Sequence, residues 1–187
     1  VALLAVAGVE VERLAGDQRL RAAFSARGQR LVDGFGADRV VEAMQPTSMV
    51  LARAVEGDCE DLWRLANEPA VRQASFHAGP IAWETHCRWF AARLGDPETF
   101  LYIARTPGGR MQGQVRFDRE VISVSVASEF AGRGLGTRLI QEGCARVFGE
   151  TTVTQARAEI KKDNAASVRA FAKAGFRPAG ETKVHGQ

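Results

Sequence analysis

Residues 124–137, VSVASEFAGRGLGT, decide the fold that the sequence predicts. A strand of alternating polar and apolar residues ends here, Gly132, Gly134 and Gly136 follow, and a helix is expected over 137–148. Glycine lets a backbone approach a ligand closely and adopt a positive φ. The first amides of a helix lack partners inside the helix and lie at the positive end of its dipole. The stretch therefore favours a site for a phosphate or pyrophosphate.

Two common nucleotide-binding motifs do not fit this glycine stretch. A Walker A loop ends in Gly-Lys-Ser/Thr, whereas Gly136 is followed directly by Thr137. A dinucleotide-binding GxGxxG motif fails because no glycine stands at its last position. Taken alone, the glycines are also compatible with a purely structural turn.

Strand and helix signals alternate along the rest of the chain. Strands are expected over 49–54, 100–104, 113–117, 121–127 and 153–161, with a last strand beginning at Phe176. Helices are expected over 58–67, 82–94, 137–148 and 165–174, and 71–80 is expected to be a loop. An antiparallel meander followed by a βαβ unit predicts an α/β fold, with a mixed but mostly antiparallel central sheet flanked by helices.

Length and composition fit one globular domain with a short extension. The chain has 187 residues, of which 45% are hydrophobic and 25% charged, which excludes a disordered or collagen-like chain. A composition shift near Pro46 separates a helical N-terminal extension, 1–46, from the main domain, 47–187. Two helices are expected in the extension, over 17–26 and 38–44. The longest nearly apolar run, 1–9, is too short for a membrane helix and lacks the features of a secretory signal.

Charge and cysteine usage exclude several classes of partner. The formal net charge of +3 is too small for the dense basic stripe of a nucleic-acid-binding protein. It fits either a small polyanionic ligand or a mildly basic solvated surface. Cys59, Cys87 and Cys144 are widely spaced and form no CxxC pair, so neither a disulfide framework nor a metal site is expected. We expect a cytoplasmic protein with no membrane partner.

In its context, the glycine stretch resembles the GNAT family of N-acetyltransferases. The context is a strand before the glycines, a helix and a strand after them, and then a second motif. That motif begins at Asn164, continues through Ser167 and Phe171, and ends in Gly175-Phe176. Two motifs in this order and at this separation are specific, and the resemblance covers about residues 49–180.

The resemblance implies a GNAT fold that binds acetyl-coenzyme A (acetyl-CoA) in a cleft between two splayed strands. The pantetheine would pair with the main chain of residues 124–126, and the pyrophosphate with the amides of residues 132–137. The implied cofactor-binding residues are Val124, Ser125, Val126, Ala131, Gly132, Arg133, Gly134, Leu135, Gly136, Thr137, Asn164, Ser167 and Phe171. The amine would attack the thioester directly in a ternary complex, without a covalent enzyme intermediate.

Two positions depart from the family pattern. Ala131 stands where the family usually has Arg or Gln, so one side-chain contact to the cofactor is missing. Phe171 stands where many members have a Tyr that protonates the leaving thiolate, and the single tyrosine, Tyr102, lies in another predicted strand. General acid catalysis typically contributes about 10²–10⁴-fold, so a slower enzyme is expected, with water or Ser167 supplying the proton.

The attacking amine must arrive unprotonated, which calls for a base. Glu159 and His86 are the principal catalytic candidates, and Glu84, Asp118 and Glu120 are also considered. Glu159 alternates with apolar neighbours and could equally lie on a solvated face. His86 shares a predicted helix face with aromatic residues, so a packed histidine is the alternative.

A narrower resemblance concerns the acceptor. The sequence around 67–90 and 116–118 resembles that of a GNAT subgroup that acetylates UDP-linked 4-amino-4,6-dideoxy sugars in pseudaminic acid biosynthesis. It implies that the sugar nucleotide is bound by Asn67, Arg72, Ser75, His86 and Trp89. An arginine suits a diphosphate and an aromatic ring suits a sugar face, although a surface arginine and a packed tryptophan are the alternatives. Residues 7–40 resemble the end of that pathway's UDP-sugar hydrolase, so the chain is expected to be part of a bifunctional polypeptide; the alternative is an inactive helical extension.

The first expectation is therefore an enzyme that moves acetyl from acetyl-CoA to the amine of a nucleotide-linked amino sugar. Acetylation of a protein N-terminus or of another small amine is the rival within the same class. A non-catalytic acyl-CoA-binding module is the rival from a different class, motivated by the departures at Ala131 and Phe171.

Overall fold

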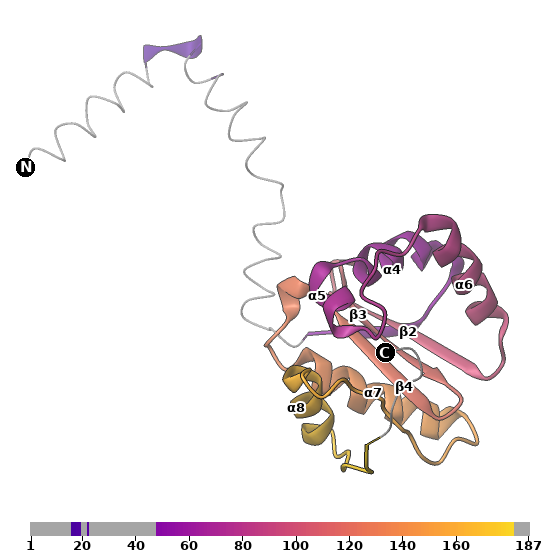
Figure 1. Cartoon of the computed structure of the whole chain (residues 1–187). Coiled ribbons are helices and arrows are strands. Elements are labelled where there is room, and N and C mark those ends of the chain that lie inside the picture. Colours follow the sequence, from indigo (N-terminus) through magenta and orange to yellow (C-terminus); the bar gives the residue numbers. More distant parts are fainter. Residues whose placement is uncertain (1–15, 20–21, 23–47, 182–187) are drawn as a thin grey trace, which may run out of the picture. The chain divides into compact units, whose positions relative to one another are not determined.

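Four antiparallel strands form the central sheet, in the order β1-β2-β3-β4 (Figure 1). The computed structural model describes residues 16–19, 22 and 48–181. The strands are β1 (Val50–Arg53), β2 (Thr99–Arg105), β3 (Met111–Asp118) and β4 (Val121–Val126). They confirm the four strands expected between residues 49 and 127, and each is joined to the next by backbone pairing along its length.

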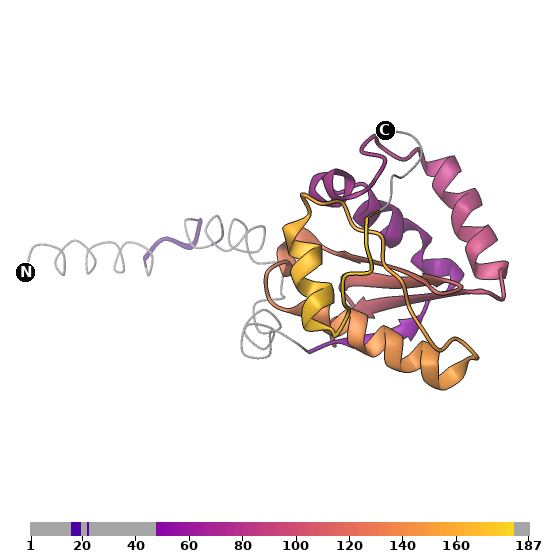
Figure 2. The same ribbon diagram turned by 60° about the horizontal axis from the view of Figure 1, so that its bottom comes forward.

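Helices cover both faces of this sheet (Figures 1 and 2). They are η1 (Glu56–Asp58), α4 (Cys59–Ala66), α5 (Pro69–Ala74), α6 (Trp83–Gly95), η2 (Ser128–Phe130), α7 (Leu135–Glu150) and α8 (Ala165–Lys173). Successive side chains of β3 face opposite layers. Val115 lies against Gly143 of α7, whereas the guanidinium of Arg116 lies 5.1 Å from the ring centroid of Trp89 on α6. One layer therefore contains α4 and α6, and the other contains α7, with α8 packed against α7.

Helix α7 supplies much of the core because its apolar residues recur at helical spacing. Leu135, Leu139, Gly143 and Val147 are buried along one stripe. A Cβ atom on Gly143 would lie 2.9 Å from a methyl carbon of Val115, so only glycine allows the helix to approach the sheet this closely. This packing fixes the start of α7 relative to the end of β4.

Strand β4 is paired along only part of its outer edge. At its beginning, Val121 forms a parallel bridge with Arg157, and the amide of Ile122 donates to the Arg157 carbonyl at 2.9 Å. No other described residue of the 153–161 segment pairs with β4. The prediction of a regular strand over 153–161 is therefore wrong. The segment touches β4 once and then diverges from it, as expected for splayed strands.

Two further predictions are wrong in detail. The expected loop over 71–80 begins with a helix, α5, because Pro69 occupies the first helical position, where its fixed φ is favourable and no amide is needed. The strand expected from Phe176 is not formed within the described residues, which end at 181. The chain divides into two units, and the strands and helices named above lie in the unit 46–187. Of the extension helix predicted over 17–26 the structure describes only residues 17–19 and 22, and the one predicted over 38–44 lies outside the described residues. Within the described part of the chain, no helix is both long and apolar enough to cross a membrane.

Candidate active site

The loop between β4 and α7 presents backbone amides rather than side chains. Gly132 and Gly134 adopt φ values of 76° and 81°, a region that other residues rarely visit. The amides of residues 132–137 donate no hydrogen bond to any residue that the structure describes, and the first amide bonded within the helix is that of Arg138, to the Gly134 carbonyl. These free donors lie at the positive end of α7, so the loop is built to bind an anion.

The outer edge of β4 adds a second set of free backbone groups beside this loop. Because the amide of Ile122 points away from β3, strand alternation directs the amides of Val124 and Val126 to the same side. Among the described residues, no chain segment pairs with this part of the edge. An extended ligand can therefore continue from the glycine loop along β4 as if it were a further strand.

Helix α8 borders the glycine loop, as the second motif predicts. The Oδ1 atom of Asn164 accepts from the Ser167 amide at 3.0 Å, so Asn164 caps this helix. Thr137 of α7 donates to the Ala170 carbonyl at 3.4 Å, which joins the two helices. Phe171 is buried and packs edge-to-face with Phe176 at 5.0 Å between ring centroids. The predicted cofactor residues are thus brought together, although Phe171 occupies the core.

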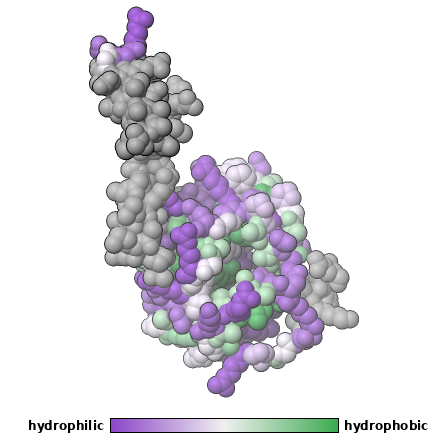
Figure 3. Space-filling model, turned by 90° about the vertical axis from the view of Figure 1, so that its left-hand side faces the viewer, coloured by the Kyte–Doolittle hydropathy of each residue, from purple (hydrophilic) through white to green (hydrophobic). Residues whose placement is uncertain are grey.

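We call the unpaired edge of β4 and the segment that diverges from it the opening, and hydrogen bonds connect the α5 region to both. Glu68, just before α5, accepts hydrogen bonds from the Ser128 amide at 2.8 Å and the Ser128 hydroxyl at 2.5 Å. At the other end, the Lys161 ammonium donates to the Gln73 carbonyl at 3.1 Å. Figure 3 views the side of the domain that carries α5 and α8, where apolar surface gathers towards the middle and hydrophilic residues surround it.

The polar residues expected to bind a sugar nucleotide form hydrogen bonds within their own loop instead. The guanidinium of Arg72 donates to the carbonyls of Ala66 at 2.6 Å and His77 at 3.1 Å, and to the Ser75 hydroxyl at 2.9 Å. Asn67 donates to the Ile81 carbonyl and accepts from the Ile81 amide. Burial lowers the pKa of Arg72 below its ordinary value. These contacts hold the α5–α6 loop in shape.

His86 lies inside the helical layer rather than in the opening. Its side chain is 2% exposed, and its Nε2 atom lies 3.1 Å from the Cys59 carbonyl. It packs against Phe90 and Trp89, at 6.1 and 5.4 Å between ring centroids. Burial lowers its pKa, and the hydrogen bond to Cys59 opposes that shift. This is the geometry of a packed histidine, the alternative that the sequence left open.

The other candidate groups differ in their surroundings. Glu159 is exposed and lies 3.6 Å from the Arg157 guanidinium, on the segment that diverges from β4. The Ser167 hydroxyl forms no hydrogen bond with a described residue. Burial raises the pKa of the Cys144 thiol to about 11, so it is not a nucleophile at neutral pH. The described residues contain no cluster of three His, Cys, Asp or Glu side chains that could hold a metal ion.

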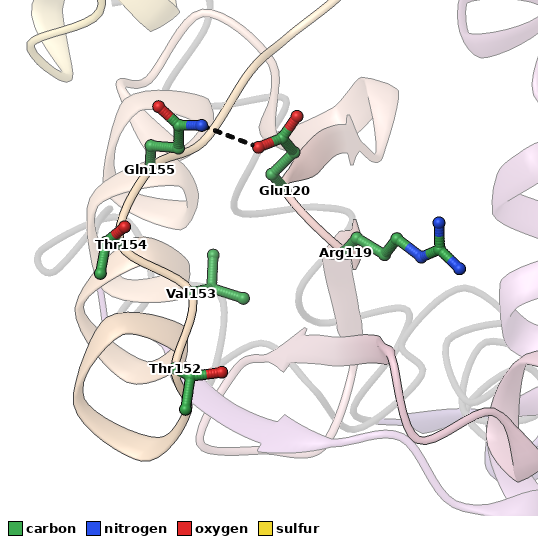
Figure 4. A pocket seen from close by; sticks show the side chains of 6 residues that line it. All are labelled: Arg119, Glu120, Thr152, Val153, Thr154 and Gln155. Atoms are coloured by element: carbon green, nitrogen blue, oxygen red, sulfur yellow. Dashed lines mark hydrogen bonds between the residues drawn. The ribbon is translucent and has the colours of Figure 1, made fainter.

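One surface pocket lies away from the glycine loop. It has a volume of about 320 Å³ and is lined by the β3–β4 turn, Arg119 and Glu120, and by the segment 152–155 (Figure 4). Glu120 and Gln155 are joined across it by a hydrogen bond of 3.0 Å, while the Arg119 side chain points away. It is therefore next to the closed end of β4 and does not belong to the candidate active site.

Three residues near the opening escaped sequence reasoning. Glu68 fixes the start of α5 to Ser128, while Gln114 and Ser123 bear buried polar atoms on the α4–α6 face of the sheet. The alternation of Ser123 with apolar neighbours was visible in the sequence, but it equally fits a strand with one solvated face. No local sequence pattern marks Gln114 or Glu68 as a functional residue.

Comparison with known proteins agrees with this geometry. Residues 49–177 match the family described as acetyltransferase (GNAT) domain. A relative named L-2,4-diaminobutyric acid acetyltransferase, from Streptomyces avermitilis, is 30% identical over 140 residues, covering 72% of this chain and 75% of the relative.

Two similar structures show the same fold at low sequence identity. An aminoglycoside acetyltransferase, AAC(6')-Ib, in complex with coenzyme A has a TM-score of 0.61 and 20% identity, covering 71% of this chain and 86% of that one. A spermidine N-acetyltransferase from Vibrio cholerae, in complex with coenzyme A and spermine, has a TM-score of 0.65 and 16% identity, covering 71% and 83%. The domain match, together with the glycine loop, leads to one conclusion: the chain belongs to the GNAT acetyltransferase family and is an acetyl-CoA-dependent acetyltransferase.

Proposed function

We propose that the acceptor is a small, polar primary amine, and that the bare glycine loop and the free edge of β4 hold acetyl-CoA. The observation that carries the proposal is the run of unbonded amides over 132–137, directly beside the unpaired edge of β4. Acetyl-CoA supplies an activated acetyl group, and its diphosphate suits these amides. Arg133 is exposed and has no ion-pair partner among the described residues, so it can add a charged contact.

Backbone groups of Val124 and Val126 align the thioester arm of the co-substrate along β4, whereas the backbone of Ser125 faces β3. Ala131 contributes only its backbone, so diphosphate binding depends on the amides of the following residues. Asn164 acts through the helix it caps, by holding α8 against the loop. Ser167, whose hydroxyl is not bonded to a described residue, is retained as the proton donor to the thiolate, and Glu159 as the base. His86 is not used, because it is buried.

A small acceptor is supported by the way α5 is held next to the opening. Glu68, just before α5, is bonded to Ser128, and Gln73 of α5 is bonded to Lys161, so the helix is held next to the unpaired edge and narrows the space for a bulky acceptor. The names of the relatives agree, since they refer to diaminobutyric acid, aminoglycosides and spermidine. All of these are compact molecules with several amines.

The UDP-linked amino sugar is the alternative acceptor. Its support comes from the sequence between 67 and 90, where Arg72 was expected to meet the diphosphate. Because the Arg72 guanidinium already donates to backbone carbonyls, we place this acceptor second. Arg72→Ala should lower the free energy of unfolding by about 1–2 kcal/mol, since the α5–α6 loop loses the hydrogen bonds that hold it. Arg64→Ala, which removes an exposed ion pair, is the control and should have almost no effect.

The experiment is release of free coenzyme A thiol from acetyl-CoA by the full chain. Four acceptors are compared: 2,4-diaminobutyrate, spermidine, a UDP-4-amino-4,6-dideoxy sugar and a peptide with a free N-terminus. We expect release with one of the first two and binding of acetyl-CoA in every case. Release only with the sugar nucleotide would establish the alternative, and release only with the peptide would indicate protein acetylation. Binding without any release would favour a non-catalytic module.

A further inference from the structure

The face of the sheet beneath α4 and α6 contains buried polar atoms that have no partner. Gln114 of β3 is 8% exposed, and its Oε1 atom accepts no hydrogen bond from a described residue. The hydroxyl of Ser123 on β4 is likewise buried and unpartnered within the described chain. Buried polar groups are nearly always satisfied, so orphaned ones need an explanation, and a ligand is one.

These two side chains are neighbours because of the strand register. Gln114 is paired with Ser125, and Arg116 with Ser123, on adjacent strands. All four point to the α4–α6 layer, since Val115 between them points to α7. Gln114 Nε2 donates weakly to the Ser125 hydroxyl at 3.4 Å, which directs its Oε1 atom elsewhere. We call Gln114, Ser123 and Ser125 the polar strip.

The polar strip lies beside the edge at which transfer would occur. Its β4 members, Ser123 and Ser125, alternate with Val124, and Val124 directs its backbone amide to the free edge. The opposite face is filled by α7, whose Leu139 and Gly143 are buried against the sheet. The face beneath α4 and α6 is the one that presents polar side chains next to this edge, so we expect an acceptor with hydrogen-bond donors to approach from there.

We infer that the polar strip binds the acceptor, through Gln114 Oε1 and the Ser123 hydroxyl, and selects amines that carry further N–H or O–H donors. This inference rests on the proposed function and names the specificity determinant of the same site. Neutral amide and hydroxyl oxygens accept hydrogen bonds without a negative charge. They therefore stabilise the ammonium form, which cannot attack a thioester, less than a carboxylate would. Apolar monoamines leave these oxygens unsatisfied and are disfavoured.

The test compares Gln114→Met and Ser123→Ala with the wild type, using thiol release with 2,4-diaminobutyrate, spermidine, kanamycin and hexylamine. In the wild type, the three multi-donor amines should have a higher kcat/KM than hexylamine. Gln114→Met should raise KM for the multi-donor amines about tenfold and leave hexylamine unchanged. Gln114→Glu keeps an acceptor oxygen and should keep the preference in KM, but its negative charge should lower kcat because it favours the ammonium form. Gln141→Met, an exposed position on α7, is the matched control.

A second readout does not need the acceptor to be known. If Gln114 serves binding, its unsatisfied buried oxygen destabilises the free protein. Gln114→Met removes that oxygen and should raise the melting temperature by about 2–6 °C. A lower melting temperature with unchanged KM ratios would overturn the inference, because Gln114 would then be structural. The affinity for acetyl-CoA is measured in parallel. If no amine is turned over although acetyl-CoA binds, the proposed function fails, and the melting temperature alone decides the role of Gln114.

Discussion

Two helices of this domain begin in opposite ways. Helix α4 has Glu60 and Asp61 in its first turn, preceded by Asp58, and its positive end is thus neutralised by its own carboxylates. Arg105 joins Asp58 and Asp61 at 2.7 and 2.9 Å, which fixes that start to β2. Helix α7 has no acidic residue in its first turn, and glycines precede it.

The difference separates a structural helix start from a binding one. At α4, the carboxylates of the first turn compensate the helix dipole, and the region contributes stability. At α7, the first backbone amides and the positive end of the dipole have no compensating groups among the described residues. This is unfavourable for the free protein and favourable for binding an anionic ligand. A helix start suited to binding an anion is therefore recognised by the lack of acidic residues and of amide partners in its first turn.

The largest expected effect concerns the pKa of Cys59, whose thiol lies at the start of α4. Helix N-termini usually lower the pKa of a thiol. Burial and the hydrogen bond with Cys87, 3.8 Å away between sulfurs, instead raise the pKa of Cys59 to about 11. At pH 8 we expect Cys59 to react with iodoacetamide roughly a hundredfold more slowly than a free thiol of pKa ~8.5. Since the folded thiol holds its proton more tightly, stability should fall as the pH rises from about 9 to 11. Mass spectrometry of Cys59 over this range, with Cys87→Ser as the control, measures it; fast labelling at pH 8 would contradict it.

A carboxylate introduced into the first turn of α7 should compensate its dipole, as the acidic residues do at α4. Gly136→Asp adds a negative charge to the first turn, next to the free amides. We expect the affinity for acetyl-CoA to fall about 10–100-fold, while the free energy of unfolding rises by about 0.3–1 kcal/mol. Calorimetric titration and thermal melting measure the two effects. Gln141→Asp, further along the exposed side of α7, should leave the affinity unchanged.

A side chain at the left-handed glycine should weaken binding without changing any charge. Gly134→Ala forces alanine to a φ of 81°, and Gly109→Ala forces the same strain at 86° in the β2–β3 turn. Both variants should lose about 1–2 kcal/mol of stability. Only Gly134→Ala should weaken acetyl-CoA binding, by about tenfold, because only it disturbs the amides. Equal affinities in the two variants would show that the loop does not bind the co-substrate.

The smallest expected effect concerns the neutralised start of α4. Asp61→Asn removes one charge from its first turn and one partner from Arg105, which keeps Asp58. The free energy of unfolding should fall by about 0.3–1 kcal/mol, with unchanged affinity for acetyl-CoA. Urea denaturation measures the first quantity. A clear loss of affinity would mean that the two helix starts are coupled.

Much of the fold and of the cofactor region followed from local patterns. Alternation over 121–127 and the glycines at 132, 134 and 136 predict β4, the turn and α7, because backbone preferences act within a few residues. The segment 153–161 has a strand-like composition, yet whether it pairs depends on what lies beside β4. The loop expected over 71–80 failed for a local reason, since Pro69 was not recognised as a helix start.

The acceptor side depended on tertiary contacts. Arg72 and Asn67 have the chemistry of ligand-binding residues, but the fold brings backbone carbonyls within reach first, so their hydrogen bonds are made within the chain. Gln114 and Ser123 have unremarkable sequence surroundings, and only the strand register and the covering helices bury them together. The sequence by itself determined the family and the glycine loop with its free amides, because backbone amides at a helix start need only local geometry. The tertiary structure alone decided which polar side chains remain free, because a hydrogen bond depends on which groups distant in sequence are brought within about 3 Å.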